Sequence, residues 1–275
     1  DAYNVAIGYV AGKYITTGLK NIIVGSLAGD ALTTGEYNIA IGHEALSTED
    51  NYGKNVAIGH MTLANQNAST DAFNVAIGYK AGVAVSTGLK NTLIGGEAGD
   101  ALTTGNYNTA VGYQALSTED AHGRNTAIGY LALTTQDAGT DGYNTAVGFE
   151  AGKVISTGTY NTITGALAGD ALTTGKYNVA IGTQALSTED GHGRNVAIGH
   201  EALTTLNAGV DAYNVAVGFK AGELMSTGTL NTLIGGLAGD ALTIGDSNVA
   251  VGYLALSAET KGDRNVAIGR EALAS

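Results

Sequence analysis

The chain contains no cysteine, no proline and no tryptophan among its 275 residues. Without cysteine it can form no disulfide bond, and it offers no thiolate to a metal ion or a substrate. The absence of proline suits a protein in which every segment of backbone donates hydrogen bonds to a neighbouring segment. No run of 18 apolar residues occurs, so we expect no membrane insertion.

Charge is scarce and its balance is acidic. Charged residues make up 14% of the chain, whereas about a quarter is usual for globular proteins. The formal net charge of -12 argues against a nucleic-acid partner, which would require a basic surface. Apolar residues still account for 44%, so a packed core is expected rather than disorder.

Enzyme signatures are also missing. The sequence has no Gly-x-Ser-x-Gly elbow, no His-Glu-x-x-His pair and no phosphate loop ending in Gly-Lys-Ser/Thr. Every candidate acid belongs to a repeated pattern, whereas a catalytic site would interrupt the repeat at one place. We therefore expect a protein that is not an enzyme and that holds no cofactor and no metal.

What the chain does contain is a repeat, marked most clearly by asparagine. Successive asparagines are separated by 17, 17, 17 and 19 residues, and this series recurs every 70 residues. The pattern predicts coils of about 17 residues, grouped in blocks of four. The eight asparagines of the first two blocks are Asn4, Asn21, Asn38, Asn55, Asn74, Asn91, Asn108 and Asn125.

A short strand and a corner follow each asparagine. The next residue is β-branched, as at Val5, and the third is Ile or Val in every coil except at Thr164. A glycine then follows in all sixteen coils, as at Gly8, and predicts a corner because glycine adopts positive φ freely. A helix over 45–50 is not expected, because no 12-residue window has a 3.6-residue period.

Both faces of these predicted strands are apolar. The first and third residues share one face and the second takes the other, because successive side chains alternate. A strand that is apolar on both sides is buried on both sides. One face can fill the coil, so the other needs a partner surface, most simply two further copies of the chain around a common axis.

The sequence therefore predicts an all-β parallel β-solenoid of about 16 coils in four 70-residue blocks. We expect it to assemble as a side-by-side homotrimer. We expect a single repeat domain over 1–275, with blocks 1–70, 71–140, 141–210 and 211–275. Because the pattern is already in progress at residue 1, we expect an excerpt of a longer fibre.

The strand motif resembles that of known surface fibres. Asn4-Val5-Ala6-Ile7-Gly8 is similar to the head repeat of YadA-like trimeric autotransporter adhesins. The segment 108–116, Asn-Thr-Ala-Val-Gly-Tyr-Gln-Ala-Leu, is similar to repeats of bacteriophage tail fibres. The resemblance covers the whole chain. It implies a left-handed β-roll, three chains side by side, and an extracellular location on a virion or a cell surface.

Two columns of side chains are candidate sites, one on the surface and one structural. Aromatic and basic residues alternate just before the asparagines, and the aromatic members could form a stripe for sugars or stabilise the fibre through cation–π contacts. That possible surface stripe comprises Tyr3, Tyr37, Tyr107, Tyr143, Tyr177 and Tyr213. The asparagines themselves are expected to form a structural amide ladder, in which each side chain bonds the one above.

Four weaker candidates remain. A second column of planar groups follows the corner glycines, and within it His43 and His60 could share a metal. Acidic residues at Asp30 and its repeats, and at Glu49-Asp50 and its repeats, are interpreted as solvated corners rather than calcium sites. Thr33-Thr34 recurs only once per block, too rarely for an ice-binding face.

These patterns favour a structural attachment fibre, as the shaft or head of a virion tail fibre or a surface adhesin. The expected partners are identical chains, with a cell-surface glycan or receptor as a further candidate. Two alternatives stay open: a self-assembling filament subunit, and a solenoid that binds glycan or ice.

Overall fold

The structure is a computed structural model that describes residues 2–275. The chain forms two compact units, Asp1–Gly142 and Tyr143–Ser275. Their boundary lies two residues beyond the boundary between the second and third sequence blocks, and the same repeat builds both units. The single repeat domain over 1–275 stays a prediction.

Each coil contributes one three-residue strand, in the place that the sequence predicts. In the first unit the strands are β1 (Val5–Ile7), β2 (Ile22–Val24), β3 (Ile39–Ile41), β4 (Val56–Ile58), β5 (Val75–Ile77), β6 (Thr92–Ile94), β7 (Thr109–Val111) and β8 (Thr126–Ile128). In the second they are β9 (Thr145–Val147), β10 (Thr162–Thr164), β11 (Val179–Ile181), β12 (Val196–Ile198), β13 (Val215–Val217), β14 (Thr232–Ile234), β15 (Val249–Val251) and β16 (Val266–Ile268). We number each coil after its strand.

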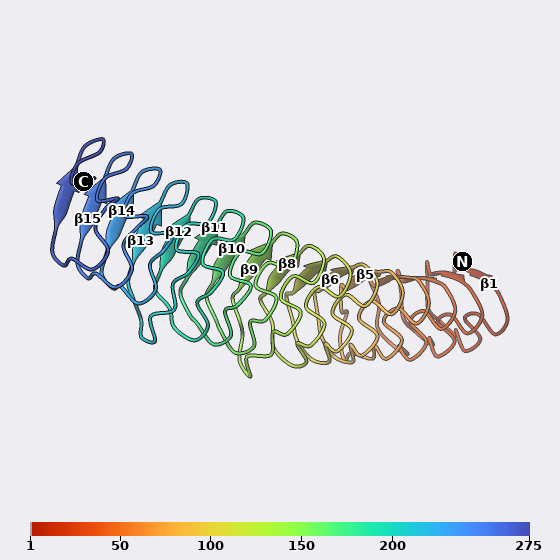
Figure 1. The fold of residues 1–275 in the computed structure, drawn as a ribbon. Helices are drawn as coiled ribbons and strands as arrows, with labels where there is room; N and C mark the ends of the chain where they lie inside the picture. Colours follow the sequence, from red (N-terminus) through yellow and green to blue (C-terminus); the bar gives the residue numbers. More distant parts are fainter. Residues whose placement is uncertain (1) are drawn as a thin grey trace. The chain divides into compact units, whose positions relative to one another are not determined.

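Within each unit the strands pair in parallel, in chain order, and Figure 1 shows each coil stacked on the next. Equivalent residues face each other across every pair, so that Ala40 lies opposite both Ile23 and Ala57. Residues 2–275 contain no helix, and hence none with the length and hydrophobicity that crossing a bilayer requires. The predicted fold class, a parallel β-solenoid with about 17 residues per coil, is confirmed.

Backbone hydrogen bonds connect the coils well beyond the strands. The Gly29 N–H donates to the Ala45 carbonyl at 2.9 Å, and the Thr33 N–H donates to the Asp50 carbonyl at 2.7 Å. A proline at such a position would remove a donor, which accounts for the absence of proline from the chain.

The interior of each coil is narrow and is lined mainly by small and aliphatic side chains. The middle residue of each strand from β2 to β15 is fully buried, usually as alanine. Four residues after the corner glycine, the first two coils of a block carry a further glycine and the last two carry leucine. A Cβ at Gly82 would lie 2.6 Å from Leu93 and 3.0 Å from Leu63, so the missing side chain makes room for leucines of the adjacent coils.

The first and third residues of every strand point out of the coil, and we call this surface the outward sheet face. None of its residues is fully buried; Ile22 of β2 is 43% exposed and Ile234 of β14 is 40% exposed. The surface carries no charged residue in either unit. In the single chain, therefore, one face of each strand fills the interior and the other meets solvent. The outward face is aliphatic except for threonines in β6 to β10 and β14.

The corners combine glycines with left-handed residues of other types. The corner glycines have φ near 138°, as at Gly95. Forty described non-glycine residues also have positive φ, including Tyr37 at 58° and Leu46 at 53°. The Tyr37 N–H donates to the Leu19 carbonyl at 3.0 Å, and the Leu46 N–H donates to the Thr62 carbonyl at 3.0 Å. Bonds of this kind offset the free-energy cost of the left-handed backbone conformation.

Candidate functional site

The asparagines lie one above another in the interior, immediately before the strands. Asn91 is fully buried, and its side-chain oxygen accepts the backbone N–H of Asn108 at 2.9 Å. Its amide Nδ2 donates to the Gly105 carbonyl at 2.9 Å. The bond that links successive asparagines is thus mainly side chain to backbone rather than amide to amide.

The same linkage runs through the first unit. The side-chain oxygen of one asparagine accepts the next backbone N–H at 2.8–3.1 Å, through Asn4, Asn21, Asn38, Asn55, Asn74, Asn91, Asn108 and Asn125. A direct amide-to-amide bond adds to it between Asn21 and Asn4 at 3.2 Å. This arrangement satisfies buried backbone groups and leaves no room for a ligand.

The aromatic stripe lies on the surface, where its members are 44–71% exposed: Tyr3, Tyr37, Tyr107, Tyr143, Tyr177 and Tyr213. Neighbours along the column contact several of the rings. The Lys20 ammonium lies 4.8 Å from the Tyr37 ring centroid and 2.9 Å from its hydroxyl. In the second unit Tyr160 stacks between Tyr143 and Tyr177, with ring centroids 5.0 and 5.2 Å apart.

This stacking limits what the stripe can bind. A sugar packs against the face of an aromatic ring, but in a stacked column most faces are turned toward the next ring or a cation. The Arg194 guanidinium lies 5.6 Å from the Tyr177 ring and 5.4 Å from the Tyr213 ring, so it occupies the space between them. The geometry therefore favours stabilisation of the coil stack by about 0.5–1 kcal/mol per contact.

The second planar column is stacked in the same way. His43 and His60 lie with their ring centroids 5.2 Å apart and their planes 14° from parallel, and His60 stacks on Tyr79. Imidazole lone pairs lie in the ring plane, and two nitrogens that share a zinc ion are at most about 4.2 Å apart. A face-to-face stack at this separation therefore does not suit a shared metal.

The threonine pairs are occupied by internal hydrogen bonds. The Thr33 hydroxyl donates to the Asp50 carbonyl at 3.0 Å, and that of Thr34 donates to the Asn51 carbonyl at 3.1 Å. Hydroxyls that tie one coil to the next are not free to order water on a flat face, which argues against an ice-binding role for these pairs.

The acidic corners differ from the sequence-based interpretation. Glu49, Glu119 and Glu189 were expected at solvated corners, but all three are fully buried. Asp100, Asp170 and Asp240 are half-buried, and burial raises the pKa of each. Aligning the coils could have shown the burial, because Glu49 falls in the same column as Ile15 and Leu32, which line the interior of the first two coils.

Burial raises the pKa of the Glu49 carboxyl to about 7, and the adjacent Asp50 charge adds to the increase. Its Oε1 accepts the Tyr52 N–H at 3.2 Å, whereas Oε2 is buried without a hydrogen-bond partner. The next coil has Gln66 in this place, whose amide donates to Ser86 and accepts from Asn74.

The substitution Glu49→Gln is expected to stabilise the protein above neutral pH. The folded-state pKa is higher than the unfolded value, so folding favours the protonated form. The contribution of Glu49 to stability is therefore most favourable below its unfolded-state pKa of about 4.3, and it is lost as the pH rises through about 7. We expect the free energy of unfolding of the variant to exceed that of the wild type by about 3 kcal/mol at pH 8, with little difference at pH 4.

Urea unfolding of both proteins between pH 4 and 8 checks this prediction. Glu36→Gln, which removes a negative charge from a half-buried surface position, is the control and should show no such pH-dependent gain. Parallel pH profiles for the wild type and Glu49→Gln would contradict it.

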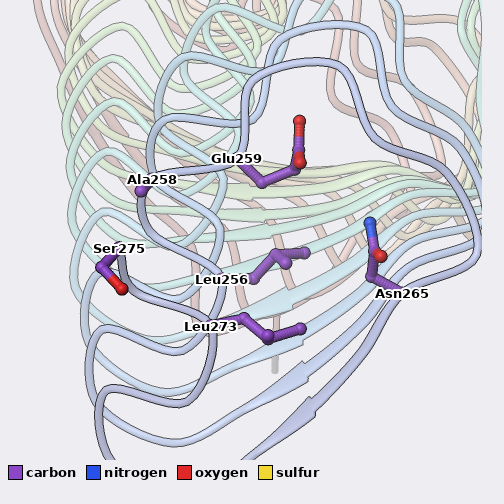
Figure 2. A pocket seen from close by; sticks show the side chains of 6 residues that line it. All are labelled: Leu256, Ala258, Glu259, Asn265, Leu273 and Ser275. Carbon is purple, nitrogen blue, oxygen red and sulfur yellow. The ribbon is translucent and has the colours of Figure 1, made fainter.

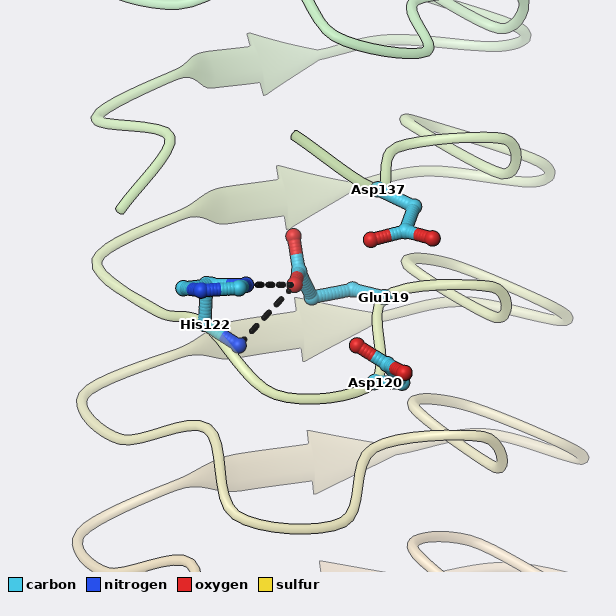
Figure 3. A group of neighbouring side chains, drawn as sticks. All are labelled: Glu119, Asp120, His122 and Asp137. Carbon is cyan, nitrogen blue, oxygen red and sulfur yellow. Dashed lines mark hydrogen bonds and ion pairs between the residues drawn. The ribbon is translucent and has the colours of Figure 1, made fainter. Parts of the chain in front are cut away.

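Two acidic corners also contain a histidine. In the first unit Glu119, Asp120, His122 and Asp137 each offer a ligand atom, and these atoms all lie within 4.8 Å of one another. Figure 3 shows the Glu119 side chain between His122 on one side and the two aspartates on the other. Burial raises the pKa of Glu119 to about 7, and the charges of Asp137 and Asp120 add to the increase.

The second unit repeats this arrangement with Glu189, Asp190 and His192. His192 Nδ1 lies 3.8 Å from Glu189 Oε1, which accepts the His192 N–H at 3.3 Å. In both units the histidine follows the buried glutamate by three residues, so the turn brings its ring over the carboxylate. Sequence reasoning missed these clusters because it treated the acidic repeats without their neighbouring histidines.

A pocket of about 200 Å³, shown in Figure 2, lies at the last coil of the second unit. It is lined by Leu256, Ala258, Glu259, Asn265, Leu273 and Ser275. Leu273 is 55% exposed, whereas Leu203 at the equivalent position is fully buried by the coil that follows it. The pocket is therefore the uncovered interior of a coil and has no feature of a substrate site.

No protein-family model matches the chain, and no curated protein is similar to it at a significant level.

Proposed function

We propose that the chain is a structural segment of an extracellular attachment fibre, in which three identical chains pack side by side through the outward sheet face. The observation that supports this proposal is the exposure of that face. Every strand in both units presents two β-branched or aliphatic side chains to solvent, and none of them carries a charge.

The shape of this face favours a particular kind of partner. It is only one three-residue strand wide, about 10 Å, yet it continues over eight coils in each unit at a spacing of about 4.8 Å. A partner must present apolar side chains at the same spacing to cover such a stripe, and a second copy of this chain does so. Cyclic symmetry then closes the assembly without leaving an apolar stripe exposed.

The role of such an assembly is mechanical. Backbone bonds between coils, the asparagine linkage and the stacked aromatic columns all resist separation of one coil from the next. The described residues offer no arrangement of nucleophile, base and substrate cavity that would suggest catalysis instead. The location on a virion or a cell surface follows from the resemblance of the strand motif to adhesin and tail-fibre repeats.

The mass in solution tests the proposal. We expect multi-angle light scattering to give three times the chain mass of 27.6 kDa. Ile181→Asp and Ile234→Asp place a charge on the outward sheet face and should release single chains, because a buried unpaired carboxylate costs several kcal/mol. Val210→Asp is the matched control: Val210 is 54% exposed but lies outside the strands, and the trimer should persist.

Circular dichroism of the same samples shows whether the variants keep their β-structure. A wild-type protein that is a stable, soluble single chain would overturn the proposal. Open polymers of indefinite mass would favour the filament alternative instead.

A further inference from the structure

We propose that the two histidine-containing acidic corners, Glu119–Asp120–His122–Asp137 and Glu189–Asp190–His192, each bind one divalent transition-metal ion of the zinc type. This inference is independent of the fibre assembly. It revises the sequence-based expectation that the protein holds no metal.

The donor set indicates the class of ion. Calcium and magnesium prefer oxygen ligands alone, whereas zinc accepts imidazole nitrogen together with carboxylate oxygen. The first corner offers one imidazole and three carboxylates, enough for a four-coordinate site. The second offers one imidazole and two carboxylates, so water would complete its coordination.

The position of the donors brings two coils together. Glu119, Asp120 and His122 come from one turn of coil 7, and Asp137 comes from the equivalent turn of coil 8. Figure 3 shows the carboxylates of Asp120 and Asp137 on the same side of Glu119, one coil above the other. An ion held there would tie adjacent coils together at a turn that has no strand.

Unsatisfied buried atoms provide a second, independent indication. Glu189 is fully buried, and its Oε2 has no hydrogen-bond partner. The Nδ1 atoms of His122 and His192 are also buried without a hydrogen-bond partner, although each lies 3.8 Å from the glutamate of its corner. In each corner the oxygen nearest to Nδ1 is Oε1, which also accepts the backbone N–H of the histidine. In the first corner Glu119 Oε2 accepts from the Asn125 amide at 3.5 Å. A buried Nδ1 without a hydrogen-bond partner beside a buried carboxylate is the inner part of a coordination site.

Among the salt bridges of residues 2–275, none joins a lysine or an arginine to a carboxylate of these corners. Arg124, the arginine nearest to His122 in the sequence, pairs with Asp141, and Arg194 pairs with Asp211 in the second unit. The carboxylates of Asp120 and Asp137 therefore remain close to Glu119 and repel it. A divalent cation would offset that repulsion.

The repeat itself contains natural controls. The first block has Asn51-Tyr52 where the second has Ala121-His122, and the fourth has Thr260-Lys261-Gly262 after its glutamate. The glutamate occurs in all four blocks, but histidine joins it only in the second and third. A purely structural glutamate would not need the histidine, since the first block folds with tyrosine in its place.

Zinc stoichiometry of the full chain tests the inference. After removal of metals with a chelator and titration with Zn²⁺, we expect native mass spectrometry to show two ions per chain. His122→Tyr and His192→Tyr should each remove one ion, and the double variant should bind none. Tyrosine is the residue that the first block uses, so the fold should persist, which circular dichroism checks.

Two further variants complete the design. Asp137→Asn makes the first corner equivalent to the second, where Asn207 occupies this place, and should weaken Zn²⁺ binding at the first corner about tenfold. His43→Tyr, outside both corners, should leave two ions bound. A chain that binds no Zn²⁺, or a double variant that still binds two ions, would overturn the inference.

Discussion

Replacement of Gly95 by alanine is expected to disrupt the coil stack of the first unit. Gly95 has a φ of 138°, which side chains with a Cβ rarely adopt. An added Cβ would lie 2.6 Å from the carbonyl carbon of Gly112 in the next coil and closer still to its oxygen. The obstacle is backbone held by hydrogen bonds on both sides, so neither coil can move away without losing them.

We expect a loss of more than about 4 kcal/mol, which is beyond the range of ordinary substitutions. Thermal unfolding followed by circular dichroism, together with proteolysis near coil 6, measures it. The adjacent Gly96 is the control, because its φ is not positive and an added Cβ would contact the Tyr113 ring at an ordinary 3.4 Å. Coil 10 already has an alanine, Ala166, at the equivalent position. Gly96→Ala should change stability by less than about 0.5 kcal/mol. Equal effects of the two variants would show that the corner is not constrained as described.

The second large effect is expected at Asn91. Asn91→Ala removes the acceptor for the Asn108 N–H and the donor for the Gly105 carbonyl, both in the interior. Each buried group left without a partner costs about 1–3 kcal/mol, so the total loss is about 2–6 kcal/mol. The backbone N–H of Asn91 still donates to the Asn74 side chain, so only the bonds to the following coil are lost.

Asn91→Asp separates the two roles of the side chain. An aspartate oxygen can still accept the Asn108 N–H, but a carboxylate oxygen then faces the Gly105 carbonyl, so we expect a greater loss at neutral pH than for alanine. Urea unfolding measures both variants, with Asn65→Ala as an exposed control that should be nearly neutral. Two buried variants as stable as this control would mean that the asparagine linkage contributes little.

The strands could be predicted from the sequence because the repeat supplies sixteen versions of one coil. The asparagine and the glycine bracket three β-branched or aliphatic residues each time, and the observed strands lie between them. A single segment such as 39–41 would have been ambiguous, since three residues carry no measurable period. Repetition at a fixed spacing made the register, and hence the parallel pairing, a necessary consequence.

The left-handed residues could not be predicted in the same way. Tyr37 and Leu46 have no intrinsic preference for positive φ, and local propensity would place neither there. Hydrogen bonds from their N–H groups to other coils impose the conformation, so the cause lies outside the local sequence. The burial of Glu49 was missed for a related reason. Its polar neighbours in the sequence, Ser-Thr and Asp, are typical of a solvated turn. Only a comparison with the equivalent positions of other coils shows that this position faces the interior.

The alternation of glycine and leucine in the interior has a consequence for how this protein can change in length. Gly82 accommodates Leu63 and Leu93, so the first coil of a block is shaped for the coil on either side of it. Duplication or deletion of 70 codons would recreate junctions that the chain already contains, and would alter its extent by about 19 Å. Loss of one coil would instead bring together two interiors that never meet in this chain. Recombination between blocks could thus vary the span of the protein in whole steps while every contact inside the stack stays as it is.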